Sequence, residues 1–127
     1  MLQPQEIEVI YVIPAIRREL AKALIESNLS QKAVAQILWL TPAAVSQYIS
    51  EKRAKEVKFT AEFSNLIKEA AKRIAQNHFL VIREIDDLCK SFEKNELICQ
   101  VHKQIDKEFD KEICNYCTQI GGNKNEN

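Results

Sequence analysis

The chain has 127 residues, and its 18 Lys and Arg balance its 18 Asp and Glu, while only two glycines and three prolines occur. So few turn-forming residues exclude a long series of strands, and we expect an all-α protein with one compact domain and an extension. The sequence has no run of about eighteen apolar residues and no cationic-apolar leader. We therefore expect no membrane span, no signal peptide and a cytoplasmic location.

The first predicted helix follows a segment whose structure the sequence leaves open. Residues 1–12 contain several large apolar residues and fit either a short helix or a strand, because their apolar pattern has no clear period. Pro14 then predicts the start of a helix over 15–26, since proline suits the first turn of a helix. The predicted core face of this helix comprises Ile16, Leu20, Ala23 and Leu24.

Residues 31–50 predict two short helices joined by a tight turn. Ser30 and Thr41 each stand where a hydroxyl oxygen caps a helix, and Pro42 suits the first position of the second helix. Ala35 is small enough to let the two helices cross closely. The apolar residues expected to pack the pair together are Val34, Ala35, Leu38, Leu40, Val45, Tyr48 and Ile49.

Small and polar residues are expected on the outer side of the second helix. Gln47 can pair bidentately with an adenine edge, Ser46 can bond to several bases, and Ala43 can contact a thymine methyl group. The cations that follow this helix suit phosphates, which position a protein without reading sequence. The predicted DNA-contacting residues are Thr41, Pro42, Ala43, Ser46, Gln47 and Ser50 in the groove, with Lys32, Lys52, Arg53 and Lys55 on phosphates.

The stretch LSQ…VA…L…T…AAVSQYIS.KR resembles the helix-turn-helix of the Cro and lambda-repressor type of transcriptional regulators, over roughly residues 14–76. The resemblance implies a sequence-specific DNA-binding regulator that acts as a homodimer, because one recognition helix reads too few base pairs. This family usually has glycine in the turn where this chain has Trp39. A non-glycine residue with positive φ costs about 1 kcal/mol, so we expect either an adjusted turn or compensating packing of Trp39.

Three further helices are predicted, over residues 60–77, 79–92 and 96–109. Thr60 caps the first of them, and a bend at Lys94-Asn95 separates the other two into a hairpin. Each helix has an apolar face at helical spacing. The predicted core residues are Phe63, Leu66, Ile67, Ala70, Ala71 and Ile74; Ile82, Ile85, Leu88, Cys89 and Phe92; and Leu97, Ile98, Val101, Ile105 and Phe109.

The predicted elements divide the chain into three parts. These are a helix-turn-helix DNA-binding bundle over 1–77, a cysteine-containing helical segment for sensing and dimerisation over 78–120, and a disordered tail over 121–127. Charge is polarised in a similar way. Residues 1–83 carry twelve Lys and Arg against eight Asp and Glu, whereas residues 84–127 carry six against ten. We therefore expect the acidic part to point away from DNA.

All four cysteines lie in the C-terminal third, with the spacing C-x9-C-x14-C-x2-C. Clustered thiols in an intracellular protein indicate a metal centre before a disulfide. Only one C-x2-C pair occurs and the other two cysteines fall on predicted helices, which favours an iron–sulfur cluster over zinc. Such a centre would sense redox or iron status by reorganising the hairpin and the dimer that spaces the two recognition helices. The predicted ligands are Cys89, Cys99, Cys114 and Cys117.

Several alternatives remain open from the sequence. The metal can be a structural zinc ion with no sensing role, or Cys89 and Cys99 can be ordinary small core residues. A protein-interaction adaptor with a thiol-redox C-x2-C pair and no DNA binding is an interpretation from another class. His78 after a helix end and His102 on a polar helical face have ordinary structural explanations. No nucleophile, base and oxyanion donor converge, so we do not expect an enzyme.

Overall fold

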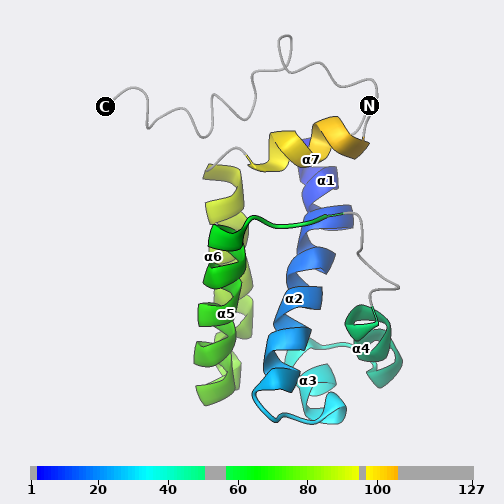
Figure 1. Ribbon diagram of the computed structural model, residues 1–127, viewed down its shortest axis with the longest axis vertical. Helices are drawn as coiled ribbons and strands as arrows, with labels where there is room; N and C mark the ends of the chain where they lie inside the picture. Colours follow the sequence, from blue (N-terminus) through cyan, green and yellow to red (C-terminus); the bar gives the residue numbers. More distant parts are fainter. Residues whose placement is uncertain (1–2, 51–56, 95–96, 106–127) are drawn as a thin grey trace.

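The computed structural model describes residues 3–50, 57–94 and 97–105, although not the side chains of residues 98, 99, 104 and 105. Every element in these ranges is helical, as the composition predicted, and no strand occurs among them (Figure 1). Within the same ranges, no helix combines the length and apolar character that crossing a bilayer requires. The elements are α1 (Pro4–Ile7), the π-helix η1 (Glu8–Val12), α2 (Ile13–Glu26), α3 (Gln31–Leu38), α4 (Pro42–Ile49), α5 (Ala61–Gln76), the 3-10 helix η2 (His78–Leu80), α6 (Val81–Lys94) and α7 (Leu97–Ile105).

A continuous helical rod runs through α1, η1 and α2 (Figure 1). The Ile13 N–H donates to the Glu8 carbonyl, the i→i+5 bond of a π-turn. This wide turn lies just before Pro14, where a regular α-helix lacks a donor and crowds the proline ring. The rod buries Ile7 and Val12 completely. The segment that the sequence left open between helix and strand is therefore helical, and the helix expected to start at Pro14 starts earlier.

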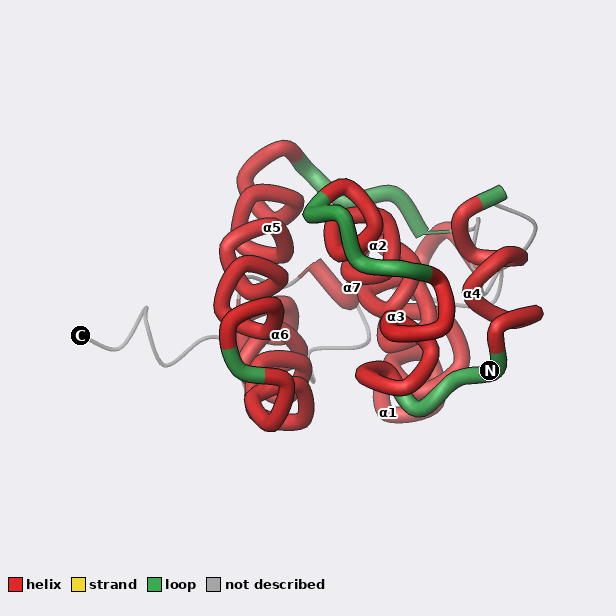
Figure 2. The backbone as a smooth tube through the Cα atoms, turned by 90° about the horizontal axis from the view of Figure 1, so that it is seen from below, coloured by secondary structure: helices red, strands yellow, loops and turns green. Residues whose placement is uncertain are grey.

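The central helix of the bundle is α2, which contacts α3, α4, α5 and α6. Figures 1 and 2 show α5 and α6 side by side on one side of α2, with α3 and α4 grouped together near one end of it. Near the other end, α7 contacts α1 and α6 (Figure 1). One cluster of buried residues includes Ile7, Ile67, Val81 and Val101. The core is therefore continuous across residue 77, where the sequence predicted a division.

A bidentate ion pair joins α5 to α6. Arg73 Nε donates to Glu84 Oε2 over 2.7 Å, and Arg73 Nη2 donates to Glu84 Oε1 over 3.0 Å. Glu84 is buried, and the two parallel bonds of such a fork fix the relative orientation of both side chains. This contact helps to determine which face of α6 turns toward the core.

Three residues have the opposite exposure from the one that the sequence predicted. Leu66 of α5 and Ile82 of α6 were expected in the core but are 46% and 60% exposed. His102 of α7 was expected on a polar face but is only 2% exposed. Apolar periodicity locates an amphipathic helix but does not fix its rotation to within one residue, because neighbouring helices select the buried face.

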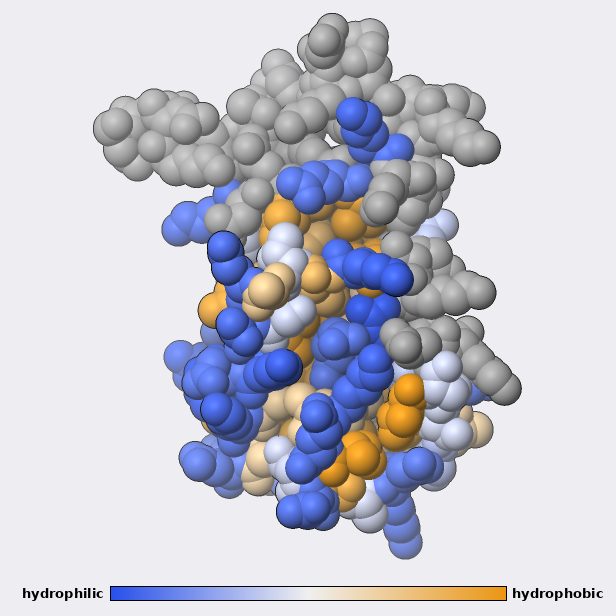
Figure 3. Space-filling view, viewed as in Figure 1, coloured by the Kyte–Doolittle hydropathy of each residue, from blue (hydrophilic) through white to orange (hydrophobic). Residues whose placement is uncertain are grey.

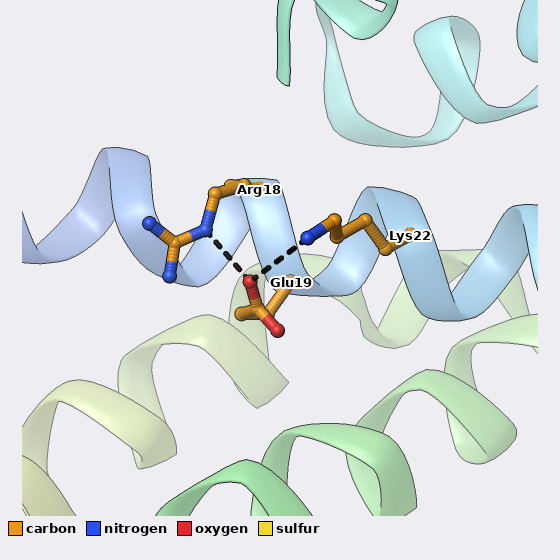
Figure 4. Close-up of polar contacts among 3 residues, drawn as sticks. All are labelled: Arg18, Glu19 and Lys22. Atoms are coloured by element: carbon orange, nitrogen blue, oxygen red, sulfur yellow. Dashed lines mark hydrogen bonds and ion pairs between the residues drawn. The ribbon is translucent and has the colours of Figure 1, made fainter. Parts of the chain in front are cut away.

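A buried arginine connects α2 to the segment before α5. Arg18 Nε donates to Glu19 Oε2 over 2.7 Å, and Lys22 Nζ lies 4.0 Å from the same oxygen (Figure 4). The Arg18 guanidinium carbon is 5.9 Å from the centroid of the Phe59 ring, within the range of a cation–π contact. Figure 3 shows one face of the bundle, on which hydrophilic side chains cover the helices and apolar side chains show between them.

Candidate nucleic-acid interface

The α3–α4 pair begins its helices where the sequence predicted. The Ser30 hydroxyl accepts a hydrogen bond from the Ala33 N–H at 3.1 Å, and the Thr41 hydroxyl accepts one from the Ala44 N–H at 3.0 Å. Pro42 occupies the first helical position of α4. Each cap satisfies one of the N–H groups that lack a partner in the first turn of a helix. These two helix starts are therefore confirmed.

The inner faces of α3 and α4 are closely packed. Ala35, Leu38 and Tyr48 are each at most 4% exposed, and Val45 is completely buried. Both helices also contact α2, which supports them from behind. Because the buried side is occupied by apolar residues, the rotation of α4 about its axis is well determined.

The outer side of α4 carries the polar residues that the sequence assigned to it. All six residues expected in a DNA groove are exposed, while Ala44, Val45 and Tyr48 of α4 are buried. Lys32 is exposed at the second position of α3. Three of the predicted phosphate contacts, Lys52, Arg53 and Lys55, lie outside the described residues. We call the exposed set the polar α4 face; it comprises Thr41, Pro42, Ala43, Ser46, Gln47 and Ser50.

The turn between α3 and α4 has a left-handed residue although it contains no glycine. Trp39 has φ 56° and ψ 44°, in the left-handed region. The Leu40 N–H donates to the Ala35 carbonyl over 2.8 Å and the Trp39 N–H to the Gln36 carbonyl over 3.4 Å, which is the pattern of a Schellman motif. Trp39 is 76% exposed, so the expectation that its packing compensates for the strain is wrong. A tryptophan in a left-handed turn, a conformation that favours glycine, is unusual.

The predicted metal centre falls mostly outside the described residues. Cys89 lies on α6 and is 7% exposed; Cys99 lies on α7, but its side chain is not described, and Cys114 and Cys117 lie beyond the described residues. Burial, followed by the nearby carboxylates Glu8, Glu93 and Asp86, raises the pKa of Cys89 to about 12. The side chains that are described contain no group of three or more His, Cys, Asp and Glu that could hold a metal ion. The four-cysteine centre therefore stays a prediction.

The environment of Cys89 affects whether this residue can bind a metal. A metal binds the thiolate, so coordination must displace a proton that this site retains strongly. The location of Cys89 on the buried side of α6 fits the alternative in which it is a small core residue.

The chain has no match among family models, curated proteins or solved structures.

Proposed function

We propose that this protein is a sequence-specific DNA-binding transcriptional regulator that inserts α4 into the major groove. The observation that carries the proposal is the division of α4 into two sides. Val45 and Tyr48 are buried against the bundle, whereas the polar α4 face is exposed along the whole helix. A helix that is firmly held on one side and presents short polar side chains on the other has the form that reading base edges requires.

Four residues of the polar α4 face contact bases in this proposal, and Lys32 contacts the DNA backbone. Gln47 pairs through its amide with an adenine edge, and Ser46 bonds to a neighbouring base. Ala43 and the methyl group of Thr41 contact thymine methyl groups. Lys32 lies at the start of α3 and contacts a phosphate, which sets the register of α4 without reading sequence.

A homodimer and a four-cysteine metal centre are part of the same proposal. The regulator acts as a homodimer, because palindromic half-sites about 34 Å apart need two recognition helices. Its four cysteines bind an iron–sulfur cluster that senses redox or iron status, with structural zinc as the alternative. The brown colour and visible absorption of the protein purified without air distinguish a cluster from zinc, which is colourless.

The test uses the full chain and a binding site selected from random duplexes. We expect Gln47→Ala to weaken binding to that site by about 1–3 kcal/mol and to relax the preference at one position, since one bidentate base contact is lost. Gln76→Ala is the matched control, because Gln76 is also an exposed glutamine but lies at the end of α5. Binding is measured by titration at several salt concentrations.

Two outcomes contradict the proposal. If the protein shows no salt-dependent affinity for duplex DNA, the adaptor interpretation replaces it. If Gln47→Ala selects the same site with unchanged affinity, then α4 does not read the groove through this face.

A further inference from the structure

Three large apolar side chains are exposed together on one side of the bundle. Phe79 is 95% exposed, Trp39 is 76% exposed and Ile82 is 60% exposed. We call these three residues the Trp39 surface. They come from the α3–α4 turn, η2 and the first turn of α6. Exposed apolar residues that occur singly are ordinary, but a group that includes two aromatic rings is typical of an interface.

The Trp39 surface is hollowed rather than flat. A hollow of about 410 Å³ lies between Trp39 and Phe79, and a second of about 250 Å³ lies on the α2 side of the same indole. Ile37, Val81 and Ile82 line both hollows together with Trp39. The apolar side chains of a partner can therefore enter on either side of the indole, which is the form of contact that contributes most to binding.

Trp39 occupies a backbone conformation that glycine adopts without strain and tryptophan does not. Because the indole is mostly exposed, it gains little packing within the chain in return for that strain. The strained turn holds a large, rigid ring outward. Its contact area is thus available to a partner.

The charges beside the Trp39 surface indicate what that partner is. On the exposed side of α6, Arg83 follows Ile82 directly, and Asp86 follows one turn later. A helix with a basic residue one turn before an acidic residue complements itself when two copies lie antiparallel across a two-fold axis. The second hollow is lined by two carboxylates, Glu8 and Asp86, and by one cation, Arg17, and burial followed by Glu93 and Asp86 raises the pKa of Glu8. A partner's arginine would reduce this excess of carboxylates.

We infer that the occupant of the Trp39 surface is a second copy of this chain, with the two α6 helices antiparallel and Arg83 of each copy paired with Asp86 of the other. This inference rests on the proposed function only for its biological purpose, which is to hold two α4 helices at once. The Trp39 surface shares no residue with the polar α4 face. Dimerisation and DNA contact would therefore use different residues, although Trp39 lies only two residues before Thr41.

The first experiment measures self-association of the full chain without DNA, by sedimentation equilibrium over a range of concentrations. We expect a monomer–dimer equilibrium whose dissociation constant rises at least about 30-fold in Ile82→Glu, as expected for loss of a central contact. Leu66→Glu is the matched control, since Leu66 is also an exposed apolar residue but lies on α5 and lines neither hollow. Circular dichroism verifies that both variants remain helical. Equal effects of the two variants, or none from Ile82→Glu, overturn the inference.

A charge exchange tests the antiparallel pairing directly. Arg83→Asp alone places two carboxylates opposite each other, and Asp86→Arg alone places two guanidinium groups opposite each other, so each variant dimerises more weakly than the original chain. In a mixture, both pairs become opposite in charge again, and we expect a heterodimer at least about 10-fold tighter than either variant alone. Asp86 already pairs with Lys90 over 3.0 Å, but both side chains are largely exposed, so the monomer tolerates the change. A mixture that associates no better than its components overturns the pairing.

Fluorescence separates a second copy from a segment of the same chain. Trp39 is the one tryptophan of the sequence, so its emission reports this surface alone. We expect emission to shift to shorter wavelength as concentration rises. A shifted emission that is independent of concentration means that the chain covers its own surface, and it overturns the inference.

A DNA measurement distinguishes failure of this inference from failure of the proposed function. Ile82→Glu is expected to keep salt-dependent binding to a duplex with one half-site and to lose cooperative binding to two. A chain that dimerises through Ile82 but binds no duplex refutes the DNA-binding proposal and leaves the dimer intact.

Discussion

The turns at the two ends of α3 have the same backbone design but different residues. Before α3, Asn28 has φ 71°, and after it Trp39 has φ 56°; among the described residues these are the two non-glycine positions with positive φ. The first turn has the Leu29 N–H on the Leu24 carbonyl at 3.3 Å, which corresponds to the 2.8 Å bond of Leu40 in the second. Both turns are Schellman motifs that end a helix.

The difference lies in how well each residue tolerates that conformation. Asparagine adopts the left-handed region more readily than other non-glycine residues, whereas a bulky aromatic residue there is an outlier. The backbone of the second turn is therefore held by its surroundings. Ala35 of α3 and Val45 of α4 are both buried, and the contact between the two helices restricts the path of the turn that joins them. The first turn follows local preference, and the second follows packing.

Enlarging the residue at the crossing of α3 and α4 is expected to have the largest effect. Ala35→Leu inserts a bulky side chain at a position that is 3% exposed, and we expect it to destabilise the fold by about 1–3 kcal/mol and to open the second turn. Ala43→Leu is the control, because Ala43 is exposed on α4 and its replacement is expected to change stability by less than about 0.5 kcal/mol. Urea unfolding measures both. Equal stability of the two variants means that packing does not hold the turn.

Removal of the helix caps is expected to affect both turns alike. Ser30→Ala and Thr41→Ala each delete a hydroxyl that accepts a backbone N–H, at 3.1 and 3.0 Å, and each is expected to cost about 1 kcal/mol. Ser46→Ala is the control, since Ser46 is exposed within α4 and caps no helix. Thermal unfolding compares the three variants. A much larger loss for one cap would show that the two turns differ in more than their left-handed residue.

Replacing the left-handed residue of either turn by glycine is expected to change the stability of the monomer least. Unlike the substitutions above, it is expected to stabilise the monomer. Trp39→Gly relieves the strained conformation and is expected to stabilise the monomer by about 0.5–1 kcal/mol, whereas Asn28→Gly is expected to gain a few tenths at most. Unfolding is measured at low concentration, so that dimerisation does not contribute. The same Trp39→Gly variant is expected to lose self-association. If Trp39→Gly is less stable than the original chain and still dimerises, the indole stabilises the monomer and not the dimer.

Much of the fold could be predicted from local features of the sequence. The hydroxyls of Ser30, Thr41 and Thr60 predicted three helix starts, because a cap and the apolar pattern that follows it are both local. The exposed and buried sides of α4 were predicted for the same reason.

The features that the sequence missed depend on contacts between distant segments. The helical start of the chain was undecided, because a π-turn before Pro14 has no simple periodic signature. The rotation of α6 that exposes Ile82 depends on its packing against α2 and α5, which includes the ion pair between Arg73 and Glu84. The buried position of His102 likewise results from the packing of α7, which contacts α1 from the opposite end of the chain.

The continuous core has a practical consequence for dissecting this molecule. Shortened chains are the usual means of isolating a DNA-binding module, and the sequence suggests a cut after residue 77. Such a cut would remove α6 and α7, which contribute Leu88, Phe92 and Val101 to the same buried cluster as Ile7 and Ile74. The remaining fragment would expose apolar surface and is expected to aggregate. Point substitutions on the intact chain, rather than deletions, are the sound way to separate its activities.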